Sequence, residues 1–143
     1  MSASAKKHLA PPRLLFVCVH NTGRSQMAEA FTRQLSGGKV VAKSAGTRPS
    51  DTLNSVVVEA MREKGIDITA HTPKLMTDDM VTRADRVFTM GCFNDTECPA
   101  VILKRSVDWA LEDPHGKPLA EVRRIRDDVE GRVRGLLKEM QIL

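Results

Sequence analysis

Short apolar runs alternate along this chain with segments whose apolar residues recur at helical spacing. Residues 14–17 are apolar without interruption, which predicts a strand buried on both faces. From about Arg24, apolar residues fall on one helical stripe until the two glycines of residues 36–38, which predict the end of a helix. A second strand is expected at residues 40–42 and a second helix at residues 55–64.

The second half of the chain continues this alternation. Thr77 precedes two aspartates, a pattern typical of the N-terminus of a short helix. A third strand is expected at residues 87–90 and a weaker fourth at 106–109. The last helix is expected over residues 118–140, where apolar positions recur at steps of three and four. Strands that alternate with helices predict an α/β fold with a parallel sheet of four strands and helices on both faces.

Length and composition fit one ordinary globular domain, which we expect over residues 13–143 after a loose, basic tail of residues 1–12. Apolar residues make up 41% of the 143, but no apolar stretch approaches the roughly 18 residues of a membrane-spanning helix. The short apolar run near the N-terminus also lacks the features of a signal peptide, so we expect a cytoplasmic protein.

The net charge of +4 does not by itself indicate nucleic-acid binding, because only 3% of residues are aromatic and Tyr is absent. A mildly positive field would instead help to attract a small oxyanion. The three cysteines, Cys18, Cys92 and Cys98, are an odd number without zinc-site spacing, which argues against a disulfide framework or a structural zinc site.

The segment from Cys18 to Ser25 carries the strongest chemical signal. It lies between the first predicted strand and the first predicted helix, where backbone N–H groups can hold an oxyanion. Arg24 adds a planar fork that matches two oxygens of a phosphate-like group. The same field favours the nucleophilic thiolate form of Cys18, and Gly23 permits a close backbone approach. We expect the oxyanion to contact a run of consecutive loop residues: Val19, His20, Asn21, Thr22, Gly23, Arg24 and Ser25.

This loop resembles the phosphate-binding loop of the low-molecular-weight protein tyrosine phosphatase superfamily, and residues 44–47, 65–67 and 113–114 recur there in the same order. The resemblance implies a three-layer fold with strand order 2-1-3-4. The run from Arg24 to Glu29 is more similar to the arsenate reductases of the superfamily than to its phosphatases, which usually carry a proline where Gln26 stands.

The resemblance also implies the chemistry. Cys18 would attack arsenate, and Asp113, placed before a proline, would protonate the departing hydroxyl. Cys92 would then attack Cys18 and release arsenite, and Cys98 would attack Cys92 to move the disulfide outward. Thioredoxin or a similar thiol reductant would reduce it, while phosphate and sulfate would compete with arsenate.

Two further expectations depend on this resemblance. No cofactor is required, but a potassium ion would be held by Asn21, Glu29, Ser44 and Asp67. Two alternative functions remain open at this stage. One is a phosphatase that acts on phosphotyrosine or a small phosphate ester, and the other is a non-enzymatic module that binds oxyanions or responds to redox state.

Overall fold

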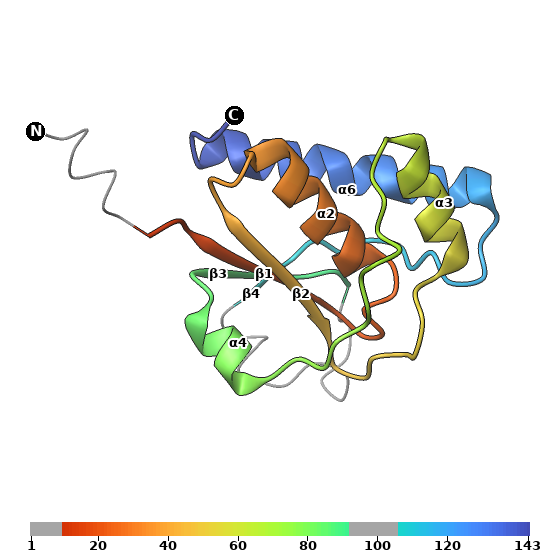
Figure 1. The fold of residues 1–143 in the computed structure, drawn as a ribbon, viewed down its shortest axis with the longest axis horizontal. Helices are drawn as coiled ribbons and strands as arrows, with labels where there is room; N and C mark the ends of the chain where they lie inside the picture. The colour runs from red at the N-terminus through yellow and green to blue at the C-terminus, as the bar shows by residue number, and fades with distance from the viewer. Residues whose placement is uncertain (1–9, 92–105) are drawn as a thin grey trace, which may run out of the picture.

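The computed structural model describes residues 10–91 and 106–143 and contains one sheet of parallel strands (Figure 1). The strands are β1 (Arg13–Cys18), β2 (Val41–Gly46), β3 (Arg86–Thr89) and β4 (Ser106–Asp108). Their order across the sheet is β2-β1-β3-β4, which confirms the order implied by the resemblance. Residues 1–9 of the tail expected over residues 1–12 lie outside the described residues, and so do Cys92 and Cys98.

Helices cover both faces of the sheet and form the outer two of three layers (Figure 1). The helices α2 (Arg24–Ser36), α3 (Ser55–Glu63) and α6 (Leu119–Glu139) lie on one face, and the short helix α4 (Asp78–Arg83) lies on the other. The sequence signals for their ends are confirmed. Gly37 ends α2 in the left-handed conformation, and the Thr77 side chain accepts a hydrogen bond from the Met80 backbone N–H at the start of α4.

The second strand is displaced from its expected position. It was expected at residues 40–42, but it runs from Val41 to Gly46 and so continues through a lysine and a serine. Ser44 is fully buried there because its hydroxyl group has polar partners within the protein. A buried serine inside a strand has no apolar signal, which explains why the sequence pattern ended the strand too early.

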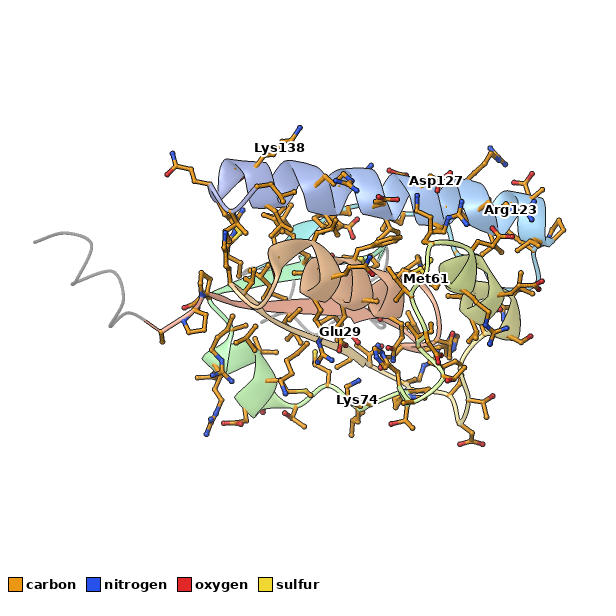
Figure 2. The ribbon with its side chains drawn as sticks, turned by 45° about the horizontal axis from the view of Figure 1, so that its top comes forward. Glu29, Met61, Lys74, Arg123, Asp127 and Lys138 are labelled. Carbon is orange, nitrogen blue, oxygen red and sulfur yellow. The ribbon has the colours of Figure 1, made fainter. Side chains whose placement is uncertain are left out.

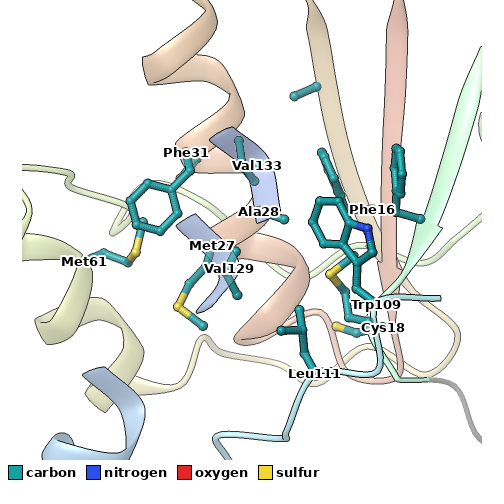
Figure 3. Close-up of a cluster of buried hydrophobic side chains, with 14 of the residues drawn as sticks. Phe16, Cys18, Met27, Ala28, Phe31, Met61, Trp109, Leu111, Val129 and Val133 are labelled. Carbon is teal, nitrogen blue, oxygen red and sulfur yellow. The ribbon is translucent and has the colours of Figure 1, made fainter. Parts of the chain in front are cut away.

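Successive side chains of β1 point to opposite faces of the sheet and so belong to two different hydrophobic clusters. Leu14, Phe16 and Cys18 face the cluster beneath α2, α3 and α6, whereas Leu15 and Val17 face the smaller cluster beneath α4. Figure 3 shows the larger cluster, in which Cys18 lies at the end of β1 near Trp109 and Leu111. The strand is therefore buried on both faces as predicted, and its last side chain points toward the α2 face.

Charged side chains connect α3 to α6 at the surface of the larger layer. The Glu63 carboxylate pairs with Arg123 at 2.7 Å and with Arg126 at 2.8 Å. Arg126 also donates a hydrogen bond to the backbone carbonyl of Ala60. Within the described part of the chain, no helix combines the length and apolar character needed to cross a membrane.

The ion pairs of Glu63 with Arg123 and Arg126 predict how the stability of the protein depends on pH. Hydrogen bonds from Arg123 and then Arg126 lower the pKa of Glu63 from 4.5 to about 2. Because the folded-state pKa is depressed, this stabilisation is complete above about pH 4.5 and is lost as the pH falls toward 2. We expect Glu63→Gln to flatten the decline in unfolding free energy over this window, as measured by urea denaturation at several pH values. The control Gly131→Ala removes no titratable group and should keep the wild-type slope, and an equal slope in Glu63→Gln would contradict the prediction.

Candidate active site

Cys18 ends β1, and its sulfur is held by polar groups from the loop and helix that follow. The side chain is buried, and its Sγ lies 2.8 Å from the Ser25 Oγ. The backbone N–H of Asn21 donates a hydrogen bond to the same sulfur at 3.2 Å. The strand therefore delivers the sulfur to the N-terminus of α2, where the sequence places the oxyanion-binding loop.

Two hydrogen-bond donors converge on the Cys18 sulfur. The Asn21 Nδ2 donates to the Ser25 Oγ at 2.7 Å, so the hydroxyl hydrogen of Ser25 is available to the sulfur. The Asn21 backbone N–H is the second donor to the sulfur. These contacts hold the sulfur at the start of the loop that the sequence identifies as oxyanion-binding.

Asn21 is the residue that ties the loop to the rest of the fold. Its backbone has a φ of 54°, in the left-handed region that asparagine tolerates better than most residues. Its Nδ2 also donates to the Ser44 Oγ on β2, and its Oδ1 accepts from the Lys74 backbone N–H. The buried Gln26 Nε2 donates to both the backbone carbonyl and the Oδ1 of Asn21. These contacts hold the loop in a conformation that its own backbone would not favour.

Two glycines permit close packing around the loop. A Cβ at Gly46 would lie 2.5 Å from the Val19 carbonyl oxygen and 3.0 Å from the Asn21 nitrogen. A Cβ at Gly23 would lie 2.8 Å from the Pro114 Cγ. Because Gly23 has no side chain, the Asp113–Pro114 pair can lie against the loop.

Arg24 and Asp113 reach the same side of the loop from different parts of the chain. The Arg24 Nη2 lies 3.7 Å from the Asp113 Oδ2, and the Asp113 side chain is 53% exposed. The Arg24 Nη1 donates to the backbone carbonyls of Met90 and Leu111, which follow β3 and β4. The structure thus brings Cys18, Arg24 and Asp113 together at the carboxyl edge of the sheet. It describes neither Cys92 nor Cys98, although Cys92 comes directly after the described Gly91.

A polar groove of about 570 Å³ opens beside the loop. His20 and Thr22 of the loop line it together with His115 and several hydroxyl-bearing residues, and no aromatic Phe, Tyr or Trp side chain is among its described walls.

Three of the four residues expected to bind potassium, Asn21, Ser44 and Glu29, are joined by hydrogen bonds to one another. Ser44 donates to Glu29 at 2.5 Å, but the Glu29 carboxylate is already paired with Arg33 at 2.7 Å. The Lys74 ammonium lies 4.0 Å from Glu29, beside β2 (Figure 2). Asp67 is exposed and accepts two hydrogen bonds from Thr69. Two positive side chains therefore already balance the one buried carboxylate, and we assign no step to a metal ion.

Sequence reasoning missed the roles of Gln26 and Gly46. Gln26 entered only as a marker of resemblance, whereas its buried amide braces Asn21 and its Oε1 lies 3.1 Å from the His71 Nδ1. Gly46 entered only as part of a recurring motif. The predicted strand stopped at residue 42, so the sequence pattern did not show that Gly46 ends a strand, where a glycine signals a close backbone contact.

Comparisons with known proteins agree with this geometry. The family model for low molecular weight phosphotyrosine protein phosphatase matches residues 13–142. Arsenate reductase 1 of Staphylococcus epidermidis is 36% identical over 123 residues, which cover 84% of this chain and 91% of that protein.

Solved structures of proteins with two different activities share this fold. The thioredoxin-dependent arsenate reductase of Corynebacterium glutamicum is 36% identical with a TM-score of 0.78, over 98% of this chain and 67% of that one. The YwlE arginine phosphatase of Geobacillus stearothermophilus is 26% identical with a TM-score of 0.80, over 92% and 94% of the two chains. The shared fold alone therefore does not decide between reduction and hydrolysis.

The Gly46 contact predicts the effect of one added methyl group. Gly46→Ala should displace the Val19 carbonyl and the Asn21 N–H, and so misalign the loop around Cys18. We expect inorganic phosphate to bind about tenfold more weakly, or worse, because sub-ångström placement matters at such sites. The measurement is the phosphate concentration that protects Cys18 from iodoacetamide, followed by mass spectrometry of the Cys18 peptide.

Gly131→Ala is the matched control, since a Cβ at Gly131 in α6 meets nothing within 4 Å. This control should keep wild-type protection and gain up to about 1 kcal/mol of helix stability. Wild-type protection in Gly46→Ala would contradict the close-contact argument.

Proposed function

This chain belongs to the low-molecular-weight phosphotyrosine protein phosphatase family, and we propose that it is an arsenate reductase that transfers electrons through three cysteines. The observation that carries the proposal is the position of Met90. Its carbonyl holds Arg24, its N–H donates to the Val17 carbonyl, and it lies two residues before Cys92 in the sequence. Since consecutive Cα atoms are about 3.8 Å apart, the chain leads from the wall of the Cys18 site to a second thiol within two residues.

The first step is common to arsenate reduction and phosphate ester hydrolysis. Arsenate is close to phosphate in shape and charge, so the same loop and Arg24 fork can bind it. The Cys18 thiolate attacks arsenic and forms a sulfur–arsenic bond. Asp113 supplies the proton with which one hydroxyl group leaves as water.

The following steps move two electrons. The Cys92 thiolate attacks the Cys18 sulfur, so a sulfur–sulfur bond forms and the electron pair of the sulfur–arsenic bond passes to arsenic. Arsenic is thereby reduced from the +5 to the +3 state and leaves as arsenite. Cys98 then attacks Cys92 and releases Cys18 as a thiolate. The resulting Cys92–Cys98 disulfide is reduced by an external dithiol, for which we propose thioredoxin. Phosphate and sulfate act as competing anions at the loop.

Cysteine variants separate reduction from hydrolysis. Cys18→Ser should lower both arsenate turnover and aryl phosphate hydrolysis by about 10³-fold or more, because both reactions start with the same nucleophile. Cys92→Ser and Cys98→Ser should abolish multiple turnover of arsenate with thioredoxin, yet leave any aryl phosphate hydrolysis largely unchanged. The assay couples arsenate turnover to thioredoxin, thioredoxin reductase and reduced nicotinamide cofactor, beside an aryl phosphate assay.

The remaining outcomes distinguish the relay from other reductants and other functions. Cys98→Ser should accumulate a Cys18–Cys92 disulfide that mass spectrometry detects. Full multiple turnover of arsenate in both variants, with thioredoxin as sole reductant, would contradict the relay. Turnover that persists only with a small thiol such as glutathione or mycothiol would change the reductant. Hydrolysis without arsenate reduction would identify a phosphatase, and no turnover of either substrate would identify an oxyanion-binding module.

We also propose that activity does not require potassium, because Arg33 and Lys74 already neutralise Glu29. Replacement of potassium by sodium at constant ionic strength should leave both the melting temperature and arsenate turnover unchanged. A rise in melting temperature that is specific to potassium would show instead that Asn21, Glu29, Ser44 and Asp67 rearrange around the ion.

A further inference from the structure

The direction of the Arg24 side chain is set by two backbone carbonyls. Its Nη1 donates to the Met90 carbonyl at 2.7 Å and to the Leu111 carbonyl at 3.1 Å. A guanidinium group has five N–H donors in a rigid fork, and these two bonds use both hydrogens of Nη1. The Nε and Nη2 groups are therefore the pair that can face two oxygens of a bound oxyanion. The direction in which the Nε and Nη2 groups point depends on the relative positions of the Met90 and Leu111 carbonyls.

Met90 and Leu111 belong to separate segments, which Asp108 connects. Asp108 is the last residue of β4 and lies opposite Thr89 in the sheet register. Its Oδ1 accepts hydrogen bonds from the Thr89 Oγ1 at 2.7 Å and from the Gly91 backbone N–H at 2.8 Å. One carboxylate oxygen thus binds the residues on both sides of Met90.

Backbone hydrogen bonds and ring packing hold the strand end of this turn, and the Asp108 carboxylate holds the rest. The Met90 N–H donates to the Val17 carbonyl, and the Trp109 N–H donates to the Thr89 carbonyl. The Trp109 ring packs against Phe88 with 4.9 Å between ring centroids. Asp108 itself is exposed, so it contributes polar contacts to the turn rather than a place in the core.

We propose that Asp108 is a positioning residue for oxyanion binding. Through Thr89 and Gly91 it fixes the Met90 carbonyl relative to Leu111, and so aims the Nε and Nη2 of Arg24 at the oxyanion. The proposal uses only the oxyanion-binding part of the proposed function, and it holds equally for a hydrolase. Its test therefore measures phosphate binding by the full chain, which needs neither Cys92 nor a reductant.

Substitutions at Asp108 should change phosphate affinity in a defined order. Asp108→Ala removes the acceptor of both hydrogen bonds, and we expect half-maximal protection of Cys18 from iodoacetamide to need about three- to tenfold more phosphate, the scale of one lost hydrogen bond. Asp108→Asn keeps an oxygen at the Oδ1 position and should restore most of the affinity. Thr89→Val removes one of the two donors at nearly constant shape and should cause a smaller loss, which keeps the test informative if Asp108→Ala folds poorly.

A double-mutant cycle distinguishes positioning from a general structural role. In an Arg24→Ala background, Asp108→Ala should cause little further loss of phosphate affinity, because its effect acts through Arg24. Asp128→Ala removes another exposed carboxylate, one that pairs with Arg132 on α6, and should leave affinity unchanged. Wild-type phosphate affinity in Asp108→Ala, or an equal loss with and without Arg24, would overturn the proposal. Absence of arsenate turnover in the wild-type chain would overturn only the proposed function.

Discussion

The position of the Cys18 sulfur depends above all on the conformation of Asn21. A non-glycine residue at a φ of 54° is uncommon, and such a conformation persists only where the surroundings determine it. Here the determining contacts come from three directions: Ser44 on β2, Gln26 on α2 and the Lys74 backbone on the segment that follows α3. The loop geometry is therefore a property of the assembled sheet edge, and the sequence from Cys18 to Ser25 does not encode it alone.

Apolar and polar contacts have different roles at this edge of the sheet. The apolar face of β1 packs Phe16 against Phe88 and Trp109, which fixes the relative positions of β1, β3 and the end of β4. Hydrogen bonds then refine those positions at the site, where Arg24 connects the ends of β3 and β4. Buried polar groups are costly without partners, and the side chains of Asn21, Arg24 and Ser25 each have hydrogen-bond partners within the protein. Such a network favours one arrangement of the site.

The sequence predicted the parts of this structure that depend on local pattern. The buried strand β1, the helices with their terminal glycine and threonine signals, and the convergence of Cys18 and Arg24 all follow from residues close together in the chain. The potassium set stays a prediction, and it shows what residue types alone leave out. Its members resemble a cation site in type, but only the tertiary structure shows that Arg33 and Lys74 already pair with Glu29. Gly46 and Asp108 were missed for the same reason, since each acts on a segment that is remote in sequence or joined only across the sheet.

In the mechanism proposed for this chain, reduction and hydrolysis would start from the same nucleophile, oxyanion loop and acid, so they would differ in what happens to the covalent intermediate. Hydrolysis needs a water molecule at the phosphorus, whereas reduction needs a second thiol at the Cys18 sulfur. The sheet order places the end of β3 beside the end of β1, and Gly91, with a φ of 110°, begins the segment that leads to Cys92. The arrangement that aims Arg24 therefore also sets the starting point of the segment that carries the second thiol. In the proposed mechanism, oxyanion binding and the approach of the second thiol would therefore both depend on one turn of the chain, residues 89–91.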